Sequence, residues 1–432
     1  MKFAVVTLGS AGDLHPFLAI ARELVRRGHD VQLLSQGPYE GQALAEGVPF
    51  RAVVDAAAHA RTLKHPLLWH PLHGFGVLWR HLAVPAIEPT CEALGELAHS
   101  ASASGERLTV LASPLAAGAR FARERWPNQI RLLSGYTAPM GLRSIEDPMF
   151  LGAWRVPHWM PSSGRRMLWR LLDRWKLEPM ARPALKRWQS QWQTSEIKSS
   201  AFGDWLHSPD GGIALYPPEF SAVPQAWQQR GVVQTGFPLF EPEHQKPLPT
   251  ELTEFIRGHP RYVLVYPGSA AMAAQQFSDL VLPACRKLGL PTVVLSPHLR
   301  GEPAVQALDA SSDVFAVDQA PLGQLLPRAC LFVHHGGIGS VAQALRHAVP
   351  ELILASAYDQ FENGCRVAEL DGGDWTSLAE ADISSVSSML SSLLSRAISA
   401  ESSERTLNSL ALAVASTSNA QTCDFLEGGS AT

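Results

Sequence analysis

The chain has 432 residues, of which 46% are hydrophobic and 18% are charged, and its formal net charge is −4. This length exceeds what one hydrophobic core usually supports, so we expect two domains, and the lack of a basic excess argues against nucleic-acid binding. No apolar run reaches the roughly 18 residues of a membrane-spanning helix. The five scattered cysteines form no CxxC pair, so we expect reduced thiols, no metal site and a cytoplasmic location.

A strand, a turn and a helix are predicted at the start of the chain. Residues 3–8 are apolar and rich in β-branched side chains, residues 9–13 are turn formers, and apolar residues then recur at helical spacing until Gly28. Pro16 lies where the first turn of a helix tolerates proline. Further strands are predicted at residues 31–35, 108–113 and 130–134. This alternation is typical of a doubly wound α/β domain with a parallel sheet.

Two tryptophan-rich insertions interrupt this pattern, at residues 61–90 and 149–206. In the second insertion, residues 167–175 place their apolar side chains on one helical face. Another face of the same helix carries three arginines, Arg166, Arg170 and Arg174, at i, i+4 and i+8. One interpretation is a helix packed on the domain with a solvated arginine face. The other is a hydrophobic acceptor pocket with a rim that faces a membrane.

The second half repeats the alternation of strands and helices after a proline-rich stretch at residues 235–249, which indicates an interdomain linker. Strands are predicted at residues 261–266, 291–296, 313–317, 331–334 and 351–355. The serine-rich residues 384–418 keep apolar side chains at helical spacing and predict terminal helices. We therefore expect two Rossmann-like domains, residues 1–240 and 241–432, that face each other across a cleft.

The stretch from Leu331 to Gln360 carries the strongest site signal. Its pattern predicts a buried strand, the turn HHGGIGS, a helix, a second strand and a loop that ends in Asp359 and Gln360. Glycines in such a turn let a ligand approach the backbone, and the following helix presents unpaired N–H groups, which favours phosphate. Sugar hydroxyls at the second loop would complete a nucleotide-sugar site. A tight turn without a ligand is the alternative, because short glycine motifs also occur by chance.

Two further loops carry polar residues at strand ends. Gly268 and Ser269 follow the first strand of the second half, although Pro-Gly pairs also mark ordinary turns. In the first half, Asp13 and His15 follow the first strand. Either can take a proton from an attacking hydroxyl, whereas Asp13 is equally suited to capping the helix. The loop has G-x-x-G in place of the G-x-G-x-x-G of dinucleotide-binding enzymes, which argues against a dehydrogenase.

The runs HHGGIGSVAQAL and YDQ resemble the donor-site motif of the inverting glycosyltransferases of the UDP-glycosyltransferase superfamily, which have the GT-B fold. The opening GSAGDLHPFLAIARELVRRGH is similar to the branch that includes sterol and antibiotic glycosyltransferases. A closer resemblance, to the bacterial rhamnosyltransferases of mono-rhamnolipid synthesis, covers most of the chain. It is carried by the runs FGVLW, RRMLWRLLDRWKL, DWLHSPDGGIALYPPEF, TGFPLF and YDQFEN.

This resemblance implies roles for individual residues. Asp13 falls where the superfamily keeps its general base, with His15 as the next candidate. Asp359 and Gln360 fall on the pair that holds hydroxyls of the donor sugar. Either His334 or His335 meets the diphosphate. The other residues assigned to donor binding are Ser10, Gly12, Ser269, Gln319, Ala320, Gly336, Gly337, Gly339 and Ser340.

The resemblance also implies an activity: transfer of L-rhamnose from dTDP-L-rhamnose to the hydroxyl of a 3-(3-hydroxyalkanoyloxy)alkanoic acid, with inversion, no cofactor and no obligatory metal. Transfer of a UDP- or dTDP-sugar to another lipophilic acceptor, such as a sterol or polyketide, is the first alternative. A non-catalytic nucleotide-sugar-binding auxiliary subunit is the second. The expected partners are the nucleotide sugar and the amphiphilic acceptor, with transient contact to the inner membrane or to the enzyme that makes the acceptor.

Overall fold

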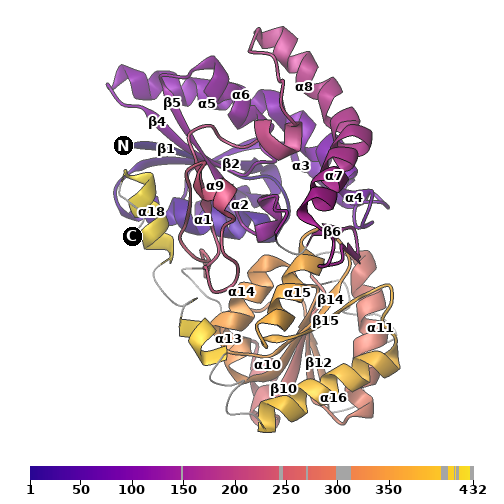
Figure 1. Cartoon of the computed structure of the whole chain (residues 1–432). Helices are drawn as coiled ribbons and strands as arrows, with labels where there is room; N and C mark the ends of the chain where they lie inside the picture. Colours follow the sequence, from indigo (N-terminus) through magenta and orange to yellow (C-terminus); the bar gives the residue numbers. More distant parts are fainter. Residues whose placement is uncertain are drawn as a thin grey trace. The chain divides into compact units, whose positions relative to one another are not determined.

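The computed structural model describes residues 1–146, 149–242, 247–268, 271–297, 313–399, 407–412, 414 and 418–428, and for residues 271–273 and 397–399 it describes the backbone alone. The chain forms two compact units. Unit 1 comprises Met1–Phe240 with Thr417–Thr432, and unit 2 comprises Glu241–Ser416. Each unit contains a parallel sheet with helices around it, which confirms the predicted doubly wound α/β class (Figure 1).

Unit 1 is built on a seven-stranded sheet in the order β3-β2-β1-β4-β5-β8-β9, with all neighbouring strands parallel. Its strands are β1 (Lys2–Val6), β2 (Asp30–Gln36), β3 (Phe50–Val54), β4 (Leu108–Ala112), β5 (Ile130–Tyr136), β8 (Gly212–Ala214) and β9 (Val232–Gln234). Strands β6 (Phe150–Leu151) and β7 (Trp154–Arg155) form a separate antiparallel hairpin. The sequence pattern predicts β1, β2, β4 and β5, whereas β8 and β9 are too short to show a period.

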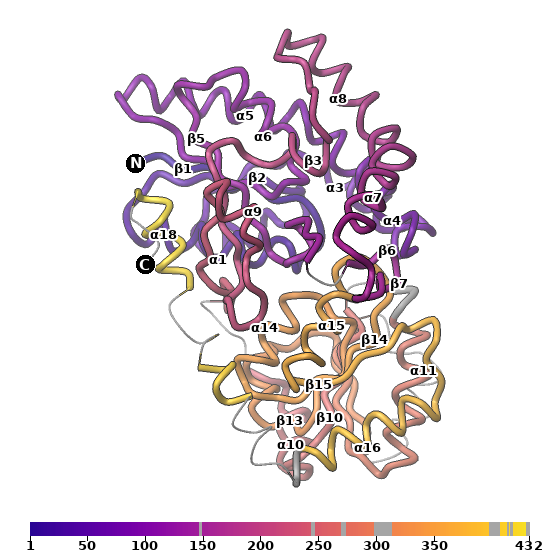
Figure 2. Tube along the Cα trace, in the orientation of Figure 1, coloured from indigo at the N-terminus to yellow at the C-terminus, as the bar shows by residue number. Residues whose placement is uncertain are grey.

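Helices cover both faces of this sheet, and others lie in the insertions. They are α1 (Ala11–Arg26), α2 (Glu40–Ala45), α3 (Ala56–Leu63), α4 (Gly74–Leu78), α5 (Val84–Ala103), α6 (Ala117–Arg125), α7 (Ser162–Leu172), α8 (Glu178–Trp192), α9 (Gln225–Gln228) and α18 (Ser418–Leu426). Short helical turns, η1 (Gly37–Tyr39), η2 (Trp79–Ala83), η3 (Pro139–Gly141), η4 (Asp173–Leu177) and η5 (Ala201–Trp205), lie between them. Figure 2 traces the same path.

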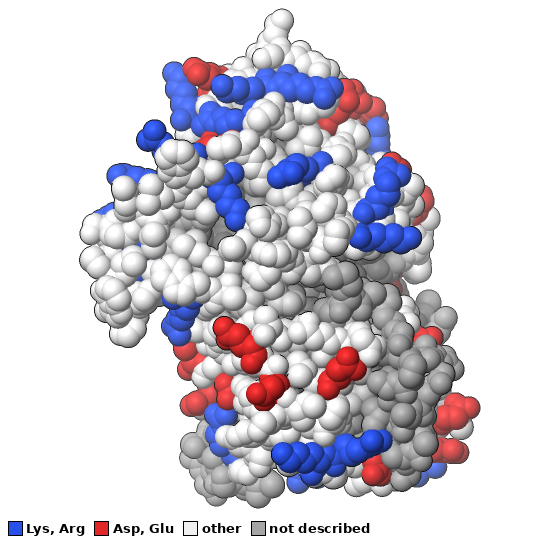
Figure 3. All heavy atoms as spheres, turned by 90° about the vertical axis from the view of Figure 1, so that its right-hand side faces the viewer, with Lys and Arg blue, Asp and Glu red and all other residues white. Residues whose placement is uncertain are grey.

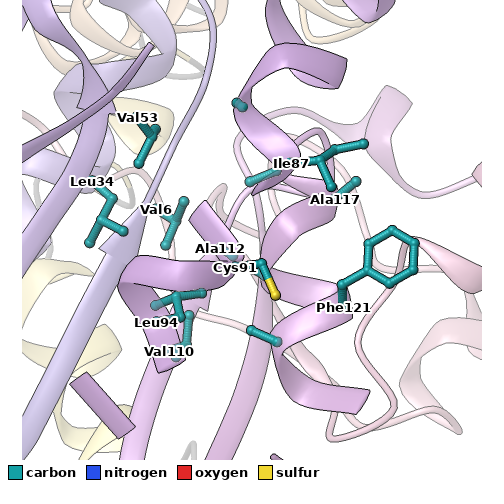
Figure 4. Packing of buried hydrophobic residues seen from close by; sticks show 14 of the residues in the cluster. Val6, Leu34, Val53, Ile87, Cys91, Leu94, Val110, Ala112, Ala117 and Phe121 are labelled. Atoms are coloured by element: carbon teal, nitrogen blue, oxygen red, sulfur yellow. The ribbon is translucent and has the colours of Figure 1, made fainter. Parts of the chain in front are cut away.

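The core of unit 1 has two halves, one on each face of the sheet. Alternate residues of β1 divide between them, because successive side chains of a strand point to opposite faces. Val6 packs with Leu94 of α5 and Phe121 of α6 in the cluster that Figure 4 shows. Phe3 and Val5 belong to the other cluster, with α1 and α18. Both faces of the central strands are therefore apolar, as a buried parallel sheet requires.

Helices α5 and α6 approach each other closely at Gly118. A Cβ at this position would lie 2.3 Å from the carbonyl oxygen of Ile87 and 2.7 Å from the Cβ of Thr90. Glycine is thus required here by the contact between the two helix backbones, since any side chain would push them apart.

The C-terminal helix α18 belongs to unit 1, whereas the sequence pattern predicts a second domain of residues 241–432. Cys423 and Leu426 are fully buried against α1 and β2. The Arg27 guanidinium lies 2.6 Å from the carboxylate of Asp424 and 3.0 Å from that of Glu427. The apolar contacts and these ion pairs hold α18 on unit 1. Because they depend on residues far apart in the sequence, the helical spacing of the C-terminal stretch cannot predict them.

Unit 2 is built on a six-stranded parallel sheet in the order β12-β11-β10-β13-β14-β15. Its strands are β10 (Tyr262–Tyr266), β11 (Thr292–Leu295), β12 (Val314–Val317), β13 (Ala329–His334), β14 (Glu351–Ala355) and β15 (Gly373–Ser377). Its described helices are α10 (Thr250–Gly258), α11 (Ala271–Lys287), α13 (Leu322–Leu325), η6 (Leu326–Arg328), α14 (Ile338–Arg346), α15 (Gln360–Glu369) and α16 (Ile383–Ser399). Strands β10 and β13 are central, so the loops that follow them lie side by side at the carboxyl edge of the sheet.

Candidate functional site

The loop between β1 and α1 holds the carboxylate of Asp13 in a fixed position. Asp13 Oδ2 accepts hydrogen bonds from the backbone N–H of Ser10 at 2.7 Å and from its hydroxyl at 2.9 Å. Gly9 has φ +146°, and a Cβ there would lie 2.2 Å from Asp13 Oδ2. The loop therefore needs glycine at this point to leave room for the carboxylate.

These bonds make Ser10 the N-cap of α1 and Asp13 its third residue, so Asp13 belongs to a capping box and is not itself the N-cap. The helix starts at Ala11, and Pro16 is inside it instead of in its first turn. Pattern reading places the start too late because the capping residues also read as turn formers.

Asp13 nevertheless keeps one carboxylate oxygen free for chemistry. Both hydrogen bonds end on Oδ2, and within the part of the chain that the structure describes none reaches Oδ1. Burial raises the pKa of Asp13 above its ordinary value, while the hydrogen bonds from Ser10 act in the opposite direction. A carboxylate with a raised pKa binds a proton more readily than an exposed one, which suits a general base.

His15 lies two positions further along the helix and is less suited to that role. Its ring stacks on Phe240 at 4.9 Å between centroids, and its Nε2 lies 3.0 Å from Nε2 of Gln42. Burial lowers the pKa of His15 to about 4. Gly12 is exposed beside Ser10, in the same turn.

At the end of β13, His334 is a structural residue. Its side chain and that of Glu351 are fully buried. The Nδ1 atom of His334 accepts a hydrogen bond from the backbone N–H of Gly336 at 3.1 Å, so its proton is on Nε2, which donates to Oε2 of Glu351 at 2.7 Å. With both ring nitrogens occupied, His334 has no atom left for a diphosphate, and the choice between the two histidines falls on His335.

The His335 ring lies between two glycines. A Cβ at Gly268 would be 2.8 Å from its Nδ1, and one at Gly337 would be 2.6 Å from its Nε2. Burial lowers the pKa of His335 to about 4. The imidazole is therefore neutral at pH 7. Its Nδ1 is buried and has no hydrogen-bond partner among the described residues, although buried ring nitrogens usually have one.

The turn from Gly336 to Ser340 leads into α14 with the backbone exposed to a ligand. Gly336 has φ +87°, and a Cβ there would lie 2.6 Å from Cγ2 of Ile353. The first N–H groups of α14, at Ile338 and Gly339, donate to no backbone carbonyl of the described residues, as is usual for the first residues of a helix. A Cβ at Gly339 would meet nothing within 4 Å, so the backbone faces open space there. Ser340, 7% exposed, is in the same turn.

The loop after β14 is joined to this turn by Asn363. Its Nδ2 donates to the carbonyl oxygen of Gly336 at 3.0 Å and to Oδ2 of Asp359 at 2.8 Å. Gln360 Oε1 accepts hydrogen bonds from the backbone N–H groups of Ser356 and Ala357 at 2.8 and 3.0 Å. The predicted diphosphate turn and the predicted sugar-binding pair are thus joined by hydrogen bonds. The side-chain oxygen of Gln360 is used within its own loop.

Two predicted positions are on other loops. Gln319 is exposed and Ala320 is half-buried, in the segment between β12 and α13. Ser269 lies outside the described residues. Within the described ranges, no three histidine, cysteine, aspartate or glutamate side chains gather as a metal site would require. For an anion, unit 2 offers the first backbone N–H groups of α14 and the neutral imidazole of His335.

Sequence reasoning assigns no role to Glu351 or Asn363. Glu351 is the first residue of the otherwise apolar strand ELILA, and a buried glutamate needs a partner, so the sequence does hold a signal for a structural role of Glu351. Asn363 lies one turn after Asp359 on the same helical face, which is a sequence signal for the hydrogen bond between these two side chains.

Two family models match parts of the chain. Residues 3–91 match the glycosyltransferase family 28 N-terminal domain, and residues 293–423 match the erythromycin biosynthesis protein CIII-like C-terminal domain. The sterol 3-beta-glucosyltransferase of Kluyveromyces lactis is 20% identical over 391 residues, which are 86% of this chain and 30% of that protein. This chain thus spans less than a third of that relative.

Solved structures resemble the whole chain. The glycotransferase of kitacinnamycin superposes with a TM-score of 0.70 at 19% identity, over 99% of this chain and 98% of the other. Spinosyn rhamnosyltransferase complexed with thymidine diphosphate superposes with a TM-score of 0.61 at 17% identity, over 99% of this chain and all (100%) of the other. At this level of identity the likeness establishes the fold.

Proposed function

We propose that this chain, a member of the GT-B glycosyltransferase superfamily related to the sterol and antibiotic glycosyltransferases, transfers a sugar from a nucleotide sugar to a lipophilic acceptor. The observation that carries the proposal is the turn after β13. It combines the free N–H groups that begin α14 with a neutral, partly unpartnered His335. Such a turn binds a diphosphate through backbone donors and the helix dipole.

In this proposal unit 2 binds the donor. The diphosphate accepts hydrogen bonds from the N–H groups of Ile338 and Gly339, from the Ser340 hydroxyl and from His335. As the bond from the anomeric carbon to the diphosphate breaks, negative charge grows on the leaving oxygen, and these donors stabilise it. Asp359 and Gln360 bind hydroxyls of the sugar, and the Gln319–Ala320 segment contacts the base.

Unit 1 supplies the general base and binds the acceptor. Asp13 Oδ1 takes the proton of the acceptor hydroxyl as its oxygen attacks the anomeric carbon on the face opposite the diphosphate, so the configuration inverts. Asp13 is favoured over His15, because burial raises the pKa of the carboxyl and lowers that of the imidazole to about 4. The non-catalytic alternative has no use for a base at this position.

We further propose dTDP-L-rhamnose as the donor and a 3-(3-hydroxyalkanoyloxy)alkanoic acid as the acceptor. The sequence runs shared with the mono-rhamnolipid rhamnosyltransferases support this choice. A relative named as a spinosyn rhamnosyltransferase, solved with thymidine diphosphate, supports a thymidine nucleotide. Other sugars and other lipophilic acceptors, such as a sterol or polyketide, fit the same site and are compared directly in the experiment.

The experiment presents dTDP-L-rhamnose, dTDP-glucose and UDP-glucose with a hydroxyacyl-hydroxy acid, a sterol and a polyketide aglycone, and identifies products by mass spectrometry. We expect Asp13→Asn to lower turnover by about 10²–10⁴-fold while donor affinity, measured by calorimetry, stays nearly constant. Asparagine keeps an acceptor for Ser10 and so preserves the cap. The variant Ser10→Ala loses one hydrogen bond to Asp13 and keeps the base. Because Ser10 is also assigned to donor binding, turnover of this variant is measured at saturating donor, where it should fall far less than that of Asp13→Asn. Turnover that survives Asp13→Asn refutes Asp13 as the base.

A further inference from the structure

A hydrogen bond joins the two tryptophan-rich insertions of unit 1, and a second one joins α7 to the segment before the β6–β7 hairpin. Lys176 Nζ, just after α7, donates to the carbonyl oxygen of Leu72 at 2.5 Å. The Trp169 indole N–H donates to the carbonyl oxygen of Ser144 at 3.2 Å. At the tip of the β6–β7 hairpin, a Cβ on Gly152 would lie 2.9 Å from Cδ2 of Leu72. Helix α7, the hairpin and the segment around Leu72 therefore form one region, visible beside α4 in Figures 1 and 2.

This region exposes large apolar side chains to solvent. Helix α7 contains no buried residue, so its apolar face is covered only in part. Trp159 and Trp175 are each 73% exposed, and Met167 is 52% exposed. We call the following side chains, together with the cations around them, the apolar–basic patch: Leu72, Trp154, Trp159, Met167, Leu171 and Trp175. Large exposed apolar side chains gathered in one region of the chain in this way mark an interaction site.

The charge around these side chains is strongly positive. Residues 154–177 contain six arginines and lysines and one acid, Asp173, in a chain with a formal net charge of −4. Asp173 is paired with Arg143 at 2.8 Å. Arg166 and Arg170 are exposed and form no ion pair with any described residue. Figure 3 looks onto this side of the molecule, where Lys and Arg lie among uncharged side chains in the upper part and acidic residues lie toward its edges.

We propose that the apolar–basic patch binds the surface of a membrane that contains anionic lipids. Tryptophan is favoured at the boundary between water and hydrocarbon, and arginine is attracted to anionic headgroups. An amphipathic helix with this composition lies in the plane of the interface, with its apolar side chains among the acyl chains. The positive charge of the patch is complementary to such a surface. This proposal does not depend on the proposed transfer activity.

The test measures cosedimentation of the protein with phosphatidylcholine vesicles, with and without added phosphatidylglycerol, at low and raised salt. We expect binding to the anionic vesicles that salt weakens. The triple variant Arg166→Glu, Arg170→Glu, Arg174→Glu should lower the partition coefficient about tenfold or more. The variant Trp159→Ala, Trp175→Ala should lower it at every salt concentration. Circular dichroism and thermal melting establish that each variant is folded.

The matched control reverses three exposed cations of unit 2, Arg261→Glu, Lys287→Glu and Arg328→Glu, which changes the net charge by the same amount. It should bind like the wild type. No binding to anionic vesicles, or an equal loss in the control, overturns the proposal. Sedimentation velocity in the absence of lipid tests whether a second copy of the chain binds the apolar–basic patch instead of a membrane. Self-association that disappears in the patch variants alone would also overturn it.

Discussion

The hydrogen bond between Glu351 and His334 is expected to join two neutral groups, and substitution of Glu351 tests this. Burial raises the pKa of Glu351 well above its ordinary value and lowers that of His334 well below its own. Oε1 of Glu351 is buried and has no hydrogen-bond partner among the described residues, which an ionised carboxylate would make very costly. We therefore expect a protonated Glu351 that accepts the Nε2–H of His334 on Oε2.

The expected cost follows from what each substitution leaves unpaired. Glu351→Gln keeps an acceptor of the same shape, so unit 2 should lose less than about 1 kcal/mol of unfolding free energy. Glu351→Leu leaves the buried N–H of His334 without a partner, which costs about 1–3 kcal/mol. The leucine variant should also loosen the Gly336 turn, because His334 holds its N–H, and weaken donor binding.

The pH dependence separates the neutral pair from an ion pair. A folded-state pKa above the ordinary 4.5 of glutamate means that the unfolded chain releases this proton first as pH rises. The native state therefore loses stability as pH increases from that value toward the folded pKa, and glutamine removes this loss. Denaturant unfolding at about pH 5 and about pH 8 should show Glu351→Gln improving relative to wild type at the higher pH. A deficit that grows with pH, or a cost equal to that of leucine, would refute the neutral pair.

Three further predictions concern unit 1. Gly118→Ala should lower the unfolding free energy by about 1–3 kcal/mol, since its Cβ would meet the Ile87 carbonyl, and an unchanged denaturation midpoint would contradict the close helix contact. Deletion of residues 418–432 should destabilise unit 1 while unit 2 melts as before, as two-transition calorimetry can show; a selective effect on unit 2 would argue against the position of α18. Burial lowers the pKa of His207 to about 4, from the 6.5 that is ordinary for histidine in an unfolded chain. The unfolded chain therefore binds a proton first as pH falls below 6.5, and the native state loses about 2 kcal/mol of unfolding free energy by pH 5. His207→Gln should reduce this acid slope in denaturation series, and an unchanged slope would contradict the shift.

The central strands of both sheets could be predicted from sequence because each is a continuous apolar run, as in β10 and β13. Strands β8, β9 and β15 could not, for different physical reasons. β8 and β9 have three residues each, and β15, with sequence GDWTS, is stabilised by pairing with β14 and not by its own composition. Backbone hydrogen bonds between strands leave no trace in a local sequence window.

The candidate site could be predicted as a set of loops but not as a set of contacts. The turn at Gly336 and its place after a buried strand follow from the motif. The distinction between His334 and His335 does not, because it depends on Glu351, which is seventeen positions away in the sequence and adjacent in the sheet. Likewise, Asp13 reads as either a cap or a base, and its hydrogen bonds show that one oxygen caps while the other stays available.

The return of α18 to unit 1 affects how the chain can fold during synthesis. Unit 2 is a continuous segment, Glu241–Ser416, whereas unit 1 is split around it. The first 240 residues therefore leave the ribosome with the pocket for Cys423 and Leu426 uncovered, and it stays so while all of unit 2 is translated. Domains usually form in the order of their synthesis. Here unit 1 is begun first and completed last, because α18 is translated after unit 2. The nascent chain therefore carries an exposed apolar surface that chaperones can bind.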